Sequence, residues 1–150
     1  MASRRTVRVV EVAPRATAVI AAVTDWEAYP ELWPVLLGEV WEVIRAAGAA
    51  AGRNVMLYRD GRPAVEVGVE LEGPFEPAGR VILSSLPGGS VATTTDPGPP
   101  TRDSLRDAHH AIAEHCLTRG LTRAGPRWEI YSHWSEIPAE NHTDIYHLLS

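Results

Sequence analysis

The heptapeptides GRNVMLY (residues 52–58) and GPRWEIY (residues 125–131) decide how the rest of the chain is interpreted. They can be aligned without a gap, and each follows a predicted helix at nearly the same distance. Self-similarity of this kind indicates a duplicated structural unit. The alignment makes Met56 and Glu129 equivalent, so one copy carries an apolar side chain where the other carries an acid.

Hydrophobic periodicity places helices and strands around these two segments. Apolar residues at three- and four-residue steps predict a helix over residues 31–47 that ends at Gly48, and a second over residues 103–118 that ends at Gly120. Alternating or β-branched runs predict the strands. These cover residues 6–12, 54–58, 64–71, 80–85, 90–95, 127–133 and 143–148.

Glycine and proline mark the connections between the strands. Asp60-Gly61 predicts a hairpin between the two strands that flank it. The sequence LPGG at residues 86–89 predicts a tight reversal between its neighbouring strands, and residues 96–100 are expected to break regular structure.

The order of these elements predicts a single α+β domain over residues 1–150, with its core at about residues 6–148. A strand, a helix and two strands form a unit that occurs twice. The two β-α-β-β units are expected to form one antiparallel sheet with two main helices on one face. A ligand groove is expected between the helices.

Composition excludes several classes of function. The net charge is −5 and all 14 basic residues are scattered arginines, which argues against direct nucleic-acid binding. No run approaches the roughly 20 apolar residues that cross a bilayer, so no membrane partner is expected. The one cysteine, Cys116, cannot form an intrachain disulfide and is expected to be a buried thiol in a cytoplasmic protein.

Metal and cofactor sites are not expected. Asp107, His110 and Glu114 share a helical face, but the histidines lack zinc-site spacing, so a solvated face is favoured. Ser84, Ser85 and Ser90 lack the surroundings of a hydrolase nucleophile.

A set of short motifs follows a recognisable order along the chain. They are Tyr58-Arg59-Asp60, Val65-Glu66-Val67-Gly68-Val69, Leu86-Pro87-Gly88-Gly89, Gly98-Pro99, Gly125-Pro126, Trp128-Glu129-Ile130-Tyr131 and Thr143-Asp144-Ile145-Tyr146. In this order and spacing they resemble the GyrI-like domain family, over nearly the whole chain. The resemblance implies a duplicated fold related to the SOUL haem-binding proteins. Such domains occur as stand-alone small-molecule binders, as effector-binding domains of bacterial transcription activators and as gyrase-inhibitory proteins.

The loop after Thr95 departs from the family pattern. Relatives often show a histidine, one residue and then Gly-Pro-Tyr, but here Asp96 and Pro100 replace the histidine and the tyrosine. This change removes two side chains that such a loop would otherwise offer to a ligand. No DNA-binding helix-turn-helix precedes Thr6, so the chain is not expected to be a one-component regulator.

Glu129 is the chief candidate functional residue. Strand alternation puts Glu129, Tyr131 and His133 on one face and Trp128 on the other. From the residues alone, Glu129 lies on a solvated face, pairs with an arginine such as Arg127, or enters a pocket. The resemblance implies a pocket carboxylate, which could select cationic ligands or activate water.

Aromatic and apolar residues supply the other candidate contacts. The candidate ligand-binding set is Trp33, Leu37, Met56, Tyr58, Glu129, Tyr131 and Tyr146, with Glu129 and Tyr131 as candidate catalytic residues. Trp33, Tyr58 and Tyr131 could stack on a planar ligand or a cation, although core packing is an alternative for each. Trp41 and Trp128 are expected in the core.

Three functions remain open. The leading hypothesis is a binding protein for a hydrophobic, planar or cationic small molecule, of the multidrug-binding type. The second is a hydrolase that opens the strained cyclopropane ring of a DNA-alkylating natural product, in which Glu129 activates water and Tyr58 or Tyr131 donates a hydrogen bond. The third is an interaction module acting on DNA gyrase or a transcription regulator.

Overall fold

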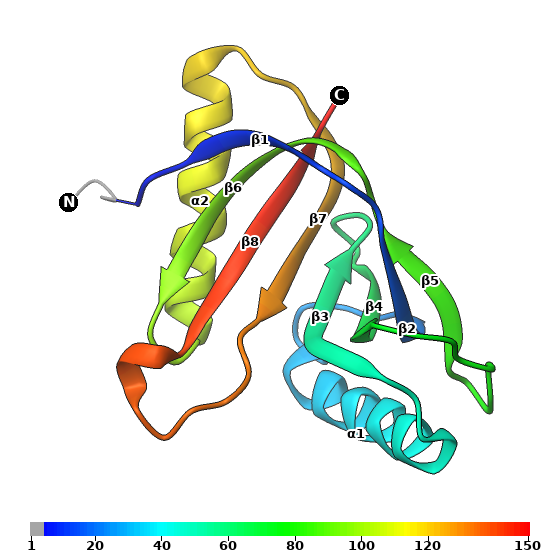
Figure 1. The fold of residues 1–150 in the computed structure, drawn as a ribbon. Helices are drawn as coiled ribbons and strands as arrows, with labels where there is room; N and C mark the ends of the chain where they lie inside the picture. Colours follow the sequence, from blue (N-terminus) through cyan, green and yellow to red (C-terminus); the bar gives the residue numbers. More distant parts are fainter. Residues whose placement is uncertain (1–4) are drawn as a thin grey trace. The chain divides into compact units, whose positions relative to one another are not determined.

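The computed structural model describes residues 5–150, which divide into two compact units (Figure 1). One unit is Pro14–Pro87, and the other combines residues 5–13 with Gly88–Ser150. Each unit packs a long helix against antiparallel strands, so the predicted α+β class is confirmed. The single domain over residues 1–150 and the groove between the helices remain predictions.

The unit Pro14–Pro87 has its helix between the first two of its strands. Its elements are β2 (Arg15–Val23), α1 (Tyr29–Ala47), β3 (Ala51–Tyr58), β4 (Ala64–Leu71) and β5 (Ile82–Leu86). In space the strands follow the order β3-β4-β2-β5. β3 and β4 are antiparallel neighbours, which confirms the hairpin predicted from Asp60-Gly61.

The second unit has the same plan. Its elements are β1 (Arg8–Val12), β6 (Gly89–Pro97), α2 (Arg102–Arg119), β7 (Arg123–Tyr131), the short 3-10 helix η1 (Pro138–Glu140) and β8 (His142–Leu149). In space the strands follow the order β1-β6-β8-β7.

The two units correspond element by element. β2-α1-β3-β4 matches β6-α2-β7-β8, while β5 pairs with β2 in the way that β1 pairs with β6. The pairing of β3 shifts register between Ala51 and Asn54, and that of β7 shifts between Arg123 and Arg127, at equivalent places. The duplication predicted from the two heptapeptides is confirmed.

Both helices end at the predicted glycines. Gly48 and Gly120 adopt the left-handed conformation, with φ of 62° and 68°, and their N–H groups bond carbonyls of the last helical turn. This conformation favours glycine because a side chain would crowd the backbone.

β2 was not predicted from the sequence. Its sequence RATAVIAAV does not alternate, and residues 17–20 are buried in succession, so both faces of the strand are covered there. A strand buried on both faces loses the period of two. The strand predicted over residues 6–12 is therefore not the first strand of the first repeat but β1, the edge strand beside β6.

The reversal predicted at residues 86–89 is wrong. β5 pairs with β2, whereas β6 pairs with β1 and β8, so the two strands flanking LPGG are not partners. Proline and glycine identify a break in the chain but do not identify which strands pair across it.

Asp96 also differs from expectation, because it continues β6 instead of breaking it. Its carboxylate is 1% exposed and accepts hydrogen bonds from Arg5, at 2.7 Å, and from the Ser104 hydroxyl, at 2.8 Å. Ser104 and Thr101 form a capping box at the start of α2. Asp96 thus ties the end of β6 to the first turn of the helix.

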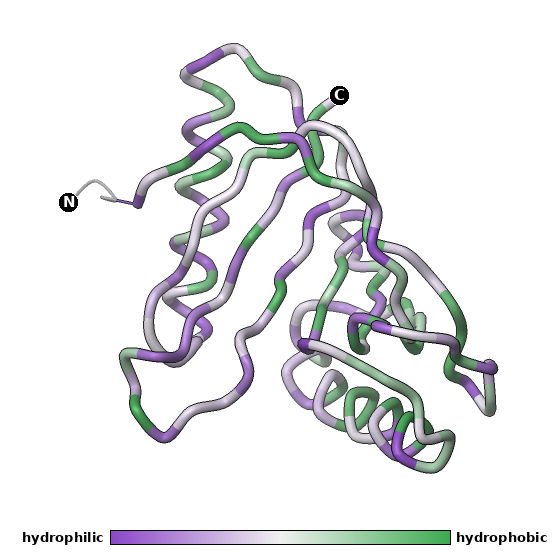
Figure 2. Tube along the Cα trace, viewed as in Figure 1, coloured by the Kyte–Doolittle hydropathy of each residue, from purple (hydrophilic) through white to green (hydrophobic). Residues whose placement is uncertain are grey.

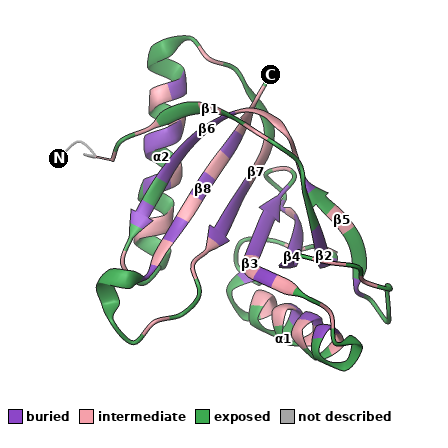
Figure 3. Ribbon diagram, viewed as in Figure 1, coloured by how far each residue is buried: buried purple, intermediate pink, exposed green. Residues whose placement is uncertain are grey.

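Each helix covers one face of the strands in its own unit (Figures 2 and 3). In the second unit, Ala108, Ile112 and Cys116 of α2 form a core cluster with Ala92 and Ile145 of the strands. Burial raises the pKa of the Cys116 thiol, as expected for a core cysteine. Over residues 5–150, no helix combines the length and apolar character that a membrane span requires.

Gly68 tests the contact between β4 and β2. A Cβ at this position would lie 1.9 Å from the Ala18 carbonyl oxygen, so Gly68→Ala should lower the free energy of unfolding by about 3 kcal/mol. The control Gly38→Ala adds a Cβ with nothing within 4 Å, on α1, and should raise stability by up to about 1 kcal/mol. Urea unfolding measures both, and equal midpoints would contradict this packing.

Candidate functional site

Glu129 faces α2 from the middle of β7. It lies opposite Ile145 of β8, and Tyr131 lies opposite Thr143. Cross-strand partners point to the same side of a sheet. Because Ile145 packs in the α2 core cluster, Glu129 and Tyr131 also point towards that helix.

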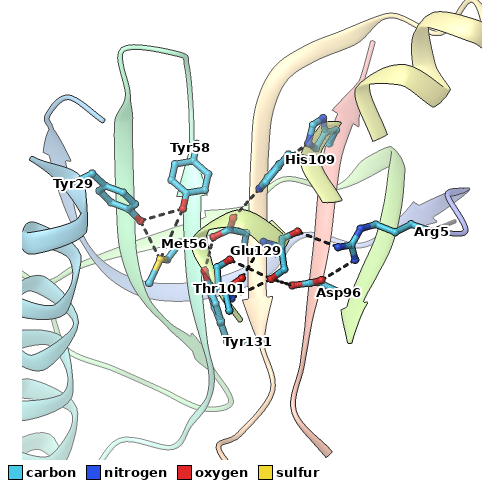
Figure 4. A network of polar contacts seen from close by, with 11 residues as sticks. Arg5, Tyr29, Met56, Tyr58, Asp96, Thr101, His109, Glu129 and Tyr131 are labelled. Atoms are coloured by element: carbon cyan, nitrogen blue, oxygen red, sulfur yellow. Dashed lines mark hydrogen bonds and ion pairs between the residues drawn. The ribbon is translucent and has the colours of Figure 1, made fainter. Parts of the chain in front are cut away.

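The Glu129 carboxylate is buried and hydrogen-bonded at both oxygens (Figure 4). Its residue is 3% exposed. The Tyr131 hydroxyl donates to Oε1 at 2.6 Å, and His109 Nε2 lies 2.7 Å from Oε2. Half-buried Tyr131 is the more accessible of the two candidate catalytic residues.

His109 connects the carboxylate to a second histidine. It belongs to α2, and its Nδ1 lies 2.8 Å from Nε2 of His147 on β8. His147 Nδ1 in turn lies 3.4 Å from Nη1 of Arg123, at the start of β7. A chain of polar contacts therefore runs from Tyr131 through Glu129 to Arg123.

His147 is held in its neutral form. It is 2% exposed, and its pKa is lowered to about 2. Burial is the largest cause, and the neighbouring His109, Arg123 and Arg127 also disfavour an added proton. At neutral pH, one ring nitrogen of His147 donates and the other accepts.

Glu70 on β4 shows a different solution for a buried carboxylate. It is 7% exposed and accepts hydrogen bonds from the guanidinium groups of Arg53 and Arg15. Burial raises its pKa, but these hydrogen bonds outweigh burial and the net shift is downward. Glu129, by contrast, receives hydrogen bonds from a phenol and an imidazole.

Met56 occupies the position of Glu129 in the other unit. It is buried, and the Tyr29 hydroxyl lies 3.0 Å from its sulfur. Tyr58, equivalent to Tyr131, lies with its hydroxyl 4.0 Å from the same sulfur. Tyr29 and Tyr58 also pack against each other and against Trp26, so an aromatic cluster lies beside Met56.

The remaining predicted ligand contacts lie in different places. Trp33 and Leu37 are half-buried and four residues apart on α1. Tyr146 stacks on buried Trp128, with ring centroids 5.5 Å apart. Because these two residues alternate with Ile145 and Glu129, they lie on the opposite sheet face, and Tyr146 is not beside Glu129.

The two tryptophans expected in the core differ. Trp128 is 2% exposed. Trp41 is only half-buried, and its indole N–H donates to Asn54 Oδ1 at 2.8 Å.

The sequence patterns did not predict the contact of His109 with Glu129, or the link through His109 to His147 and Arg123. Two signals were present. His109 is three residues before Ile112, on the apolar side of α2, and His147 alternates with Ile145. The candidate metal face of Asp107, His110 and Glu114 is exposed, and no group of three or more His, Cys, Asp or Glu within residues 5–150 is placed to hold a metal ion.

Comparisons with known proteins are informative at the level of structure. No protein-family model and no curated protein matches the sequence. The EcmrR C-terminal domain superposes with a TM-score of 0.78 at 20% identity, covering 99% of both chains. SAV2435 bound to tetraphenylphosphonium gives 0.69 at 9% identity, covering 97% of this chain and 94% of the other. A hydrolase from Listeria innocua gives 0.58 at 13% identity, covering 99% and 94%.

The chain has the fold of a GyrI-like domain. In a complex of EcmrR with DNA, the matched region spans 57% of the EcmrR chain and 97% of this chain, at 22% identity and a TM-score of 0.75. These identities establish a common fold.

The neutral His147 predicts how the stability of this protein depends on pH. The pKa of His147 is about 2 in the folded protein, against the ordinary value of 6.5 expected when the chain is unfolded. Between these two pH values the unfolded chain therefore binds more protons than the folded protein. Stability should therefore fall as pH falls below about 6.5, by up to about 1.4 kcal/mol per pH unit from this group.

His147→Gln should remove this contribution to the slope. His110→Gln, at an exposed position of α2, is the control and should leave the slope unchanged. Urea unfolding at several pH values measures both. An identical pH slope in the His147 variant would show that this imidazole does not stay neutral on folding.

Proposed function

We propose that this GyrI-like domain binds a hydrophobic organic cation and that Glu129 supplies the negative charge that recognises it. The observation that carries the proposal is a carboxylate only 3% exposed, bonded by Tyr131 and His109. A charged carboxylate loses its hydration when it is buried, and this raises its free energy. A cationic ligand offsets that loss because it supplies an opposite charge.

Tyr131 offers the route by which a ligand could reach this charge. Its hydroxyl covers Oε1 of Glu129, and its side chain is half-buried. When a cation takes the place of this hydroxyl, the carboxylate exchanges a hydrogen bond from an uncharged donor for an ion pair in a low-dielectric site. The phenol ring can then lie against the cation, since aromatic faces attract positive charge.

The comparison with SAV2435 supports the same class of ligand. That protein shares the fold and was solved with tetraphenylphosphonium, a hydrophobic cation. Trp33, Leu37, Met56 and Tyr58 remain proposed ligand contacts, because planar and apolar side chains suit such a molecule.

A matched pair of ligands tests charge recognition. Methyltriphenylphosphonium and triphenylphosphine oxide share three aryl groups, and only the first is a cation. Glu129→Gln should lower the affinity for the cation by about tenfold or more, equivalent to about 1.4 kcal/mol. The affinity for the neutral compound should be nearly unchanged. Isothermal titration calorimetry provides both affinities.

Glu114→Gln is the control, because it removes the same charge from an exposed site on α2. Its affinity for the cation should match that of the unchanged protein. If Glu129→Gln binds the cation equally well, charge recognition by Glu129 is wrong.

Ring-opening hydrolysis is a second candidate, favoured by the 2.6 Å contact between Tyr131 and Glu129. Glu129 would take a proton from water as the water oxygen bonds to a ring carbon. The strained carbon–carbon bond would break and pass its electrons to a conjugated carbonyl, whose oxygen would accept a hydrogen bond from Tyr131. The resulting enolate would then take the proton held by Glu129, so that the product is the substrate plus one water. The hydrolase from Listeria innocua shares the fold.

Mass spectrometry tests this second candidate. A cyclopropane-bearing alkylator incubated with the protein should gain the mass of one water faster than in buffer. Glu129→Gln should reduce the rate by about a hundredfold or more, whereas Glu114→Gln should not. A rate equal to that in buffer would exclude the reaction for that compound.

A further inference from the structure

The polar chain behind Glu129 has a direction that its geometry determines. Arg123 carries only hydrogen-bond donors, so His147 Nδ1, 3.4 Å from Nη1, is the accepting nitrogen. A neutral imidazole with an accepting Nδ1 carries its hydrogen on Nε2. That hydrogen points at His109 Nδ1, 2.8 Å away.

The same reasoning sets the state of His109. Since His109 Nδ1 accepts from His147, its hydrogen lies on Nε2 and donates to Glu129 Oε2 at 2.7 Å. A second proton on His109 would lie on Nδ1 and would face the N–H of His147. Two donors facing each other at this distance repel, so this arrangement favours neutral His109.

We propose that His147 is a positioning residue that acts on Glu129 through His109, by preventing His109 from becoming an internal cation that would compete with a ligand cation. This inference rests on the function proposed above and assigns charge selection to residues that do not contact the ligand. His109 Nε2 lies 2.7 Å from Glu129 Oε2, so a charged His109 would form an ion pair with the carboxylate that the ligand cation needs.

The groups around His147 support this assignment. His109 faces it from α2, Arg123 and Arg127 face it from β7, and Ala92 lies opposite it on β6. Burial is the largest cause of the lowered pKa of His147, and His109, Arg123 and Arg127 lower it further. The thiol of Cys116, near Arg123, is uncharged because burial raises its pKa.

Nuclear magnetic resonance of the ligand-free protein tests the inference directly. With ¹⁵N-labelled histidine, His109 at about pH 7 should show one protonated nitrogen, Nε2, and one bare nitrogen, Nδ1. His109→Gln assigns the signals by removing them. Two protonated nitrogens on His109 in the unchanged protein would overturn the proposal.

Calorimetry of cation binding gives an independent readout. If His109 is already neutral, methyltriphenylphosphonium should bind at about pH 7 without releasing a proton, so the heat should not depend on the ionisation enthalpy of the buffer. Release of about one proton would mean that the ligand displaces an imidazolium and would overturn the proposal.

Two variants extend the test. His147→Gln can turn its amide oxygen towards His109, and Arg123→Met removes the donor that orients His147. Each variant should let His109 take a second proton. The affinity for methyltriphenylphosphonium should then fall by about tenfold at about pH 6 and by less at about pH 8.5. Arg119→Met, exposed at the end of α2, removes the same charge as Arg123→Met and should change neither pH profile nor proton release. Unaltered pH profiles in folded His147 and Arg123 variants would refute the role.

The two proposals fail differently. If no cation binds but His109 is neutral with its hydrogen on Nε2, the binding function is wrong and the hydrogen-bond chain stands. If the cation binds through Glu129 but His109 is an imidazolium, the function stands and the role of His147 is wrong.

Discussion

The pair of hydrogen bonds to Glu129 is the interaction on which the candidate site depends. A carboxylate at 3% exposure requires donors, and these come from two elements, His109 on α2 and Tyr131 on β7. The register of β7 on β8 and the rotation of α2 must both be correct for these bonds to form. The register places His147 where it can bond His109, so the order of the site follows from the order of the fold.

Duplication gives this protein an internal comparison. In one unit the framework places two phenols beside the sulfur of Met56. In the other it places a phenol and an imidazole beside the carboxylate of Glu129. A tyrosine follows two residues after each central side chain. The framework is thus compatible with either an apolar or a charged centre, and the two centres differ in their side chains without a change of topology.

Sequence patterns predicted the parts of this structure that depend on local physics. Both helices, their ends at Gly48 and Gly120, and the shared face of Glu129 and Tyr131 follow from period, from the need of glycine for a left-handed turn, and from strand alternation. Patterns failed where partners decide the outcome. β2 lost its alternation through burial on both faces, and the contact of His109 with His147 joins residues 38 positions apart, which no local period encodes.

The placement of β1 has a consequence for how the chain is made. β1 pairs with β6, joining Arg8 to Thr93, whereas the pairs β3–β4, β4–β2 and β2–β5 each join strands within Pro14–Pro87. During synthesis from the amino terminus, these three pairs can therefore form while β1 still lacks its partner. Closing so long a loop is slow compared with local pairing. The backbone groups of β1 that bond β6 must therefore stay unpaired until β6 has left the ribosome.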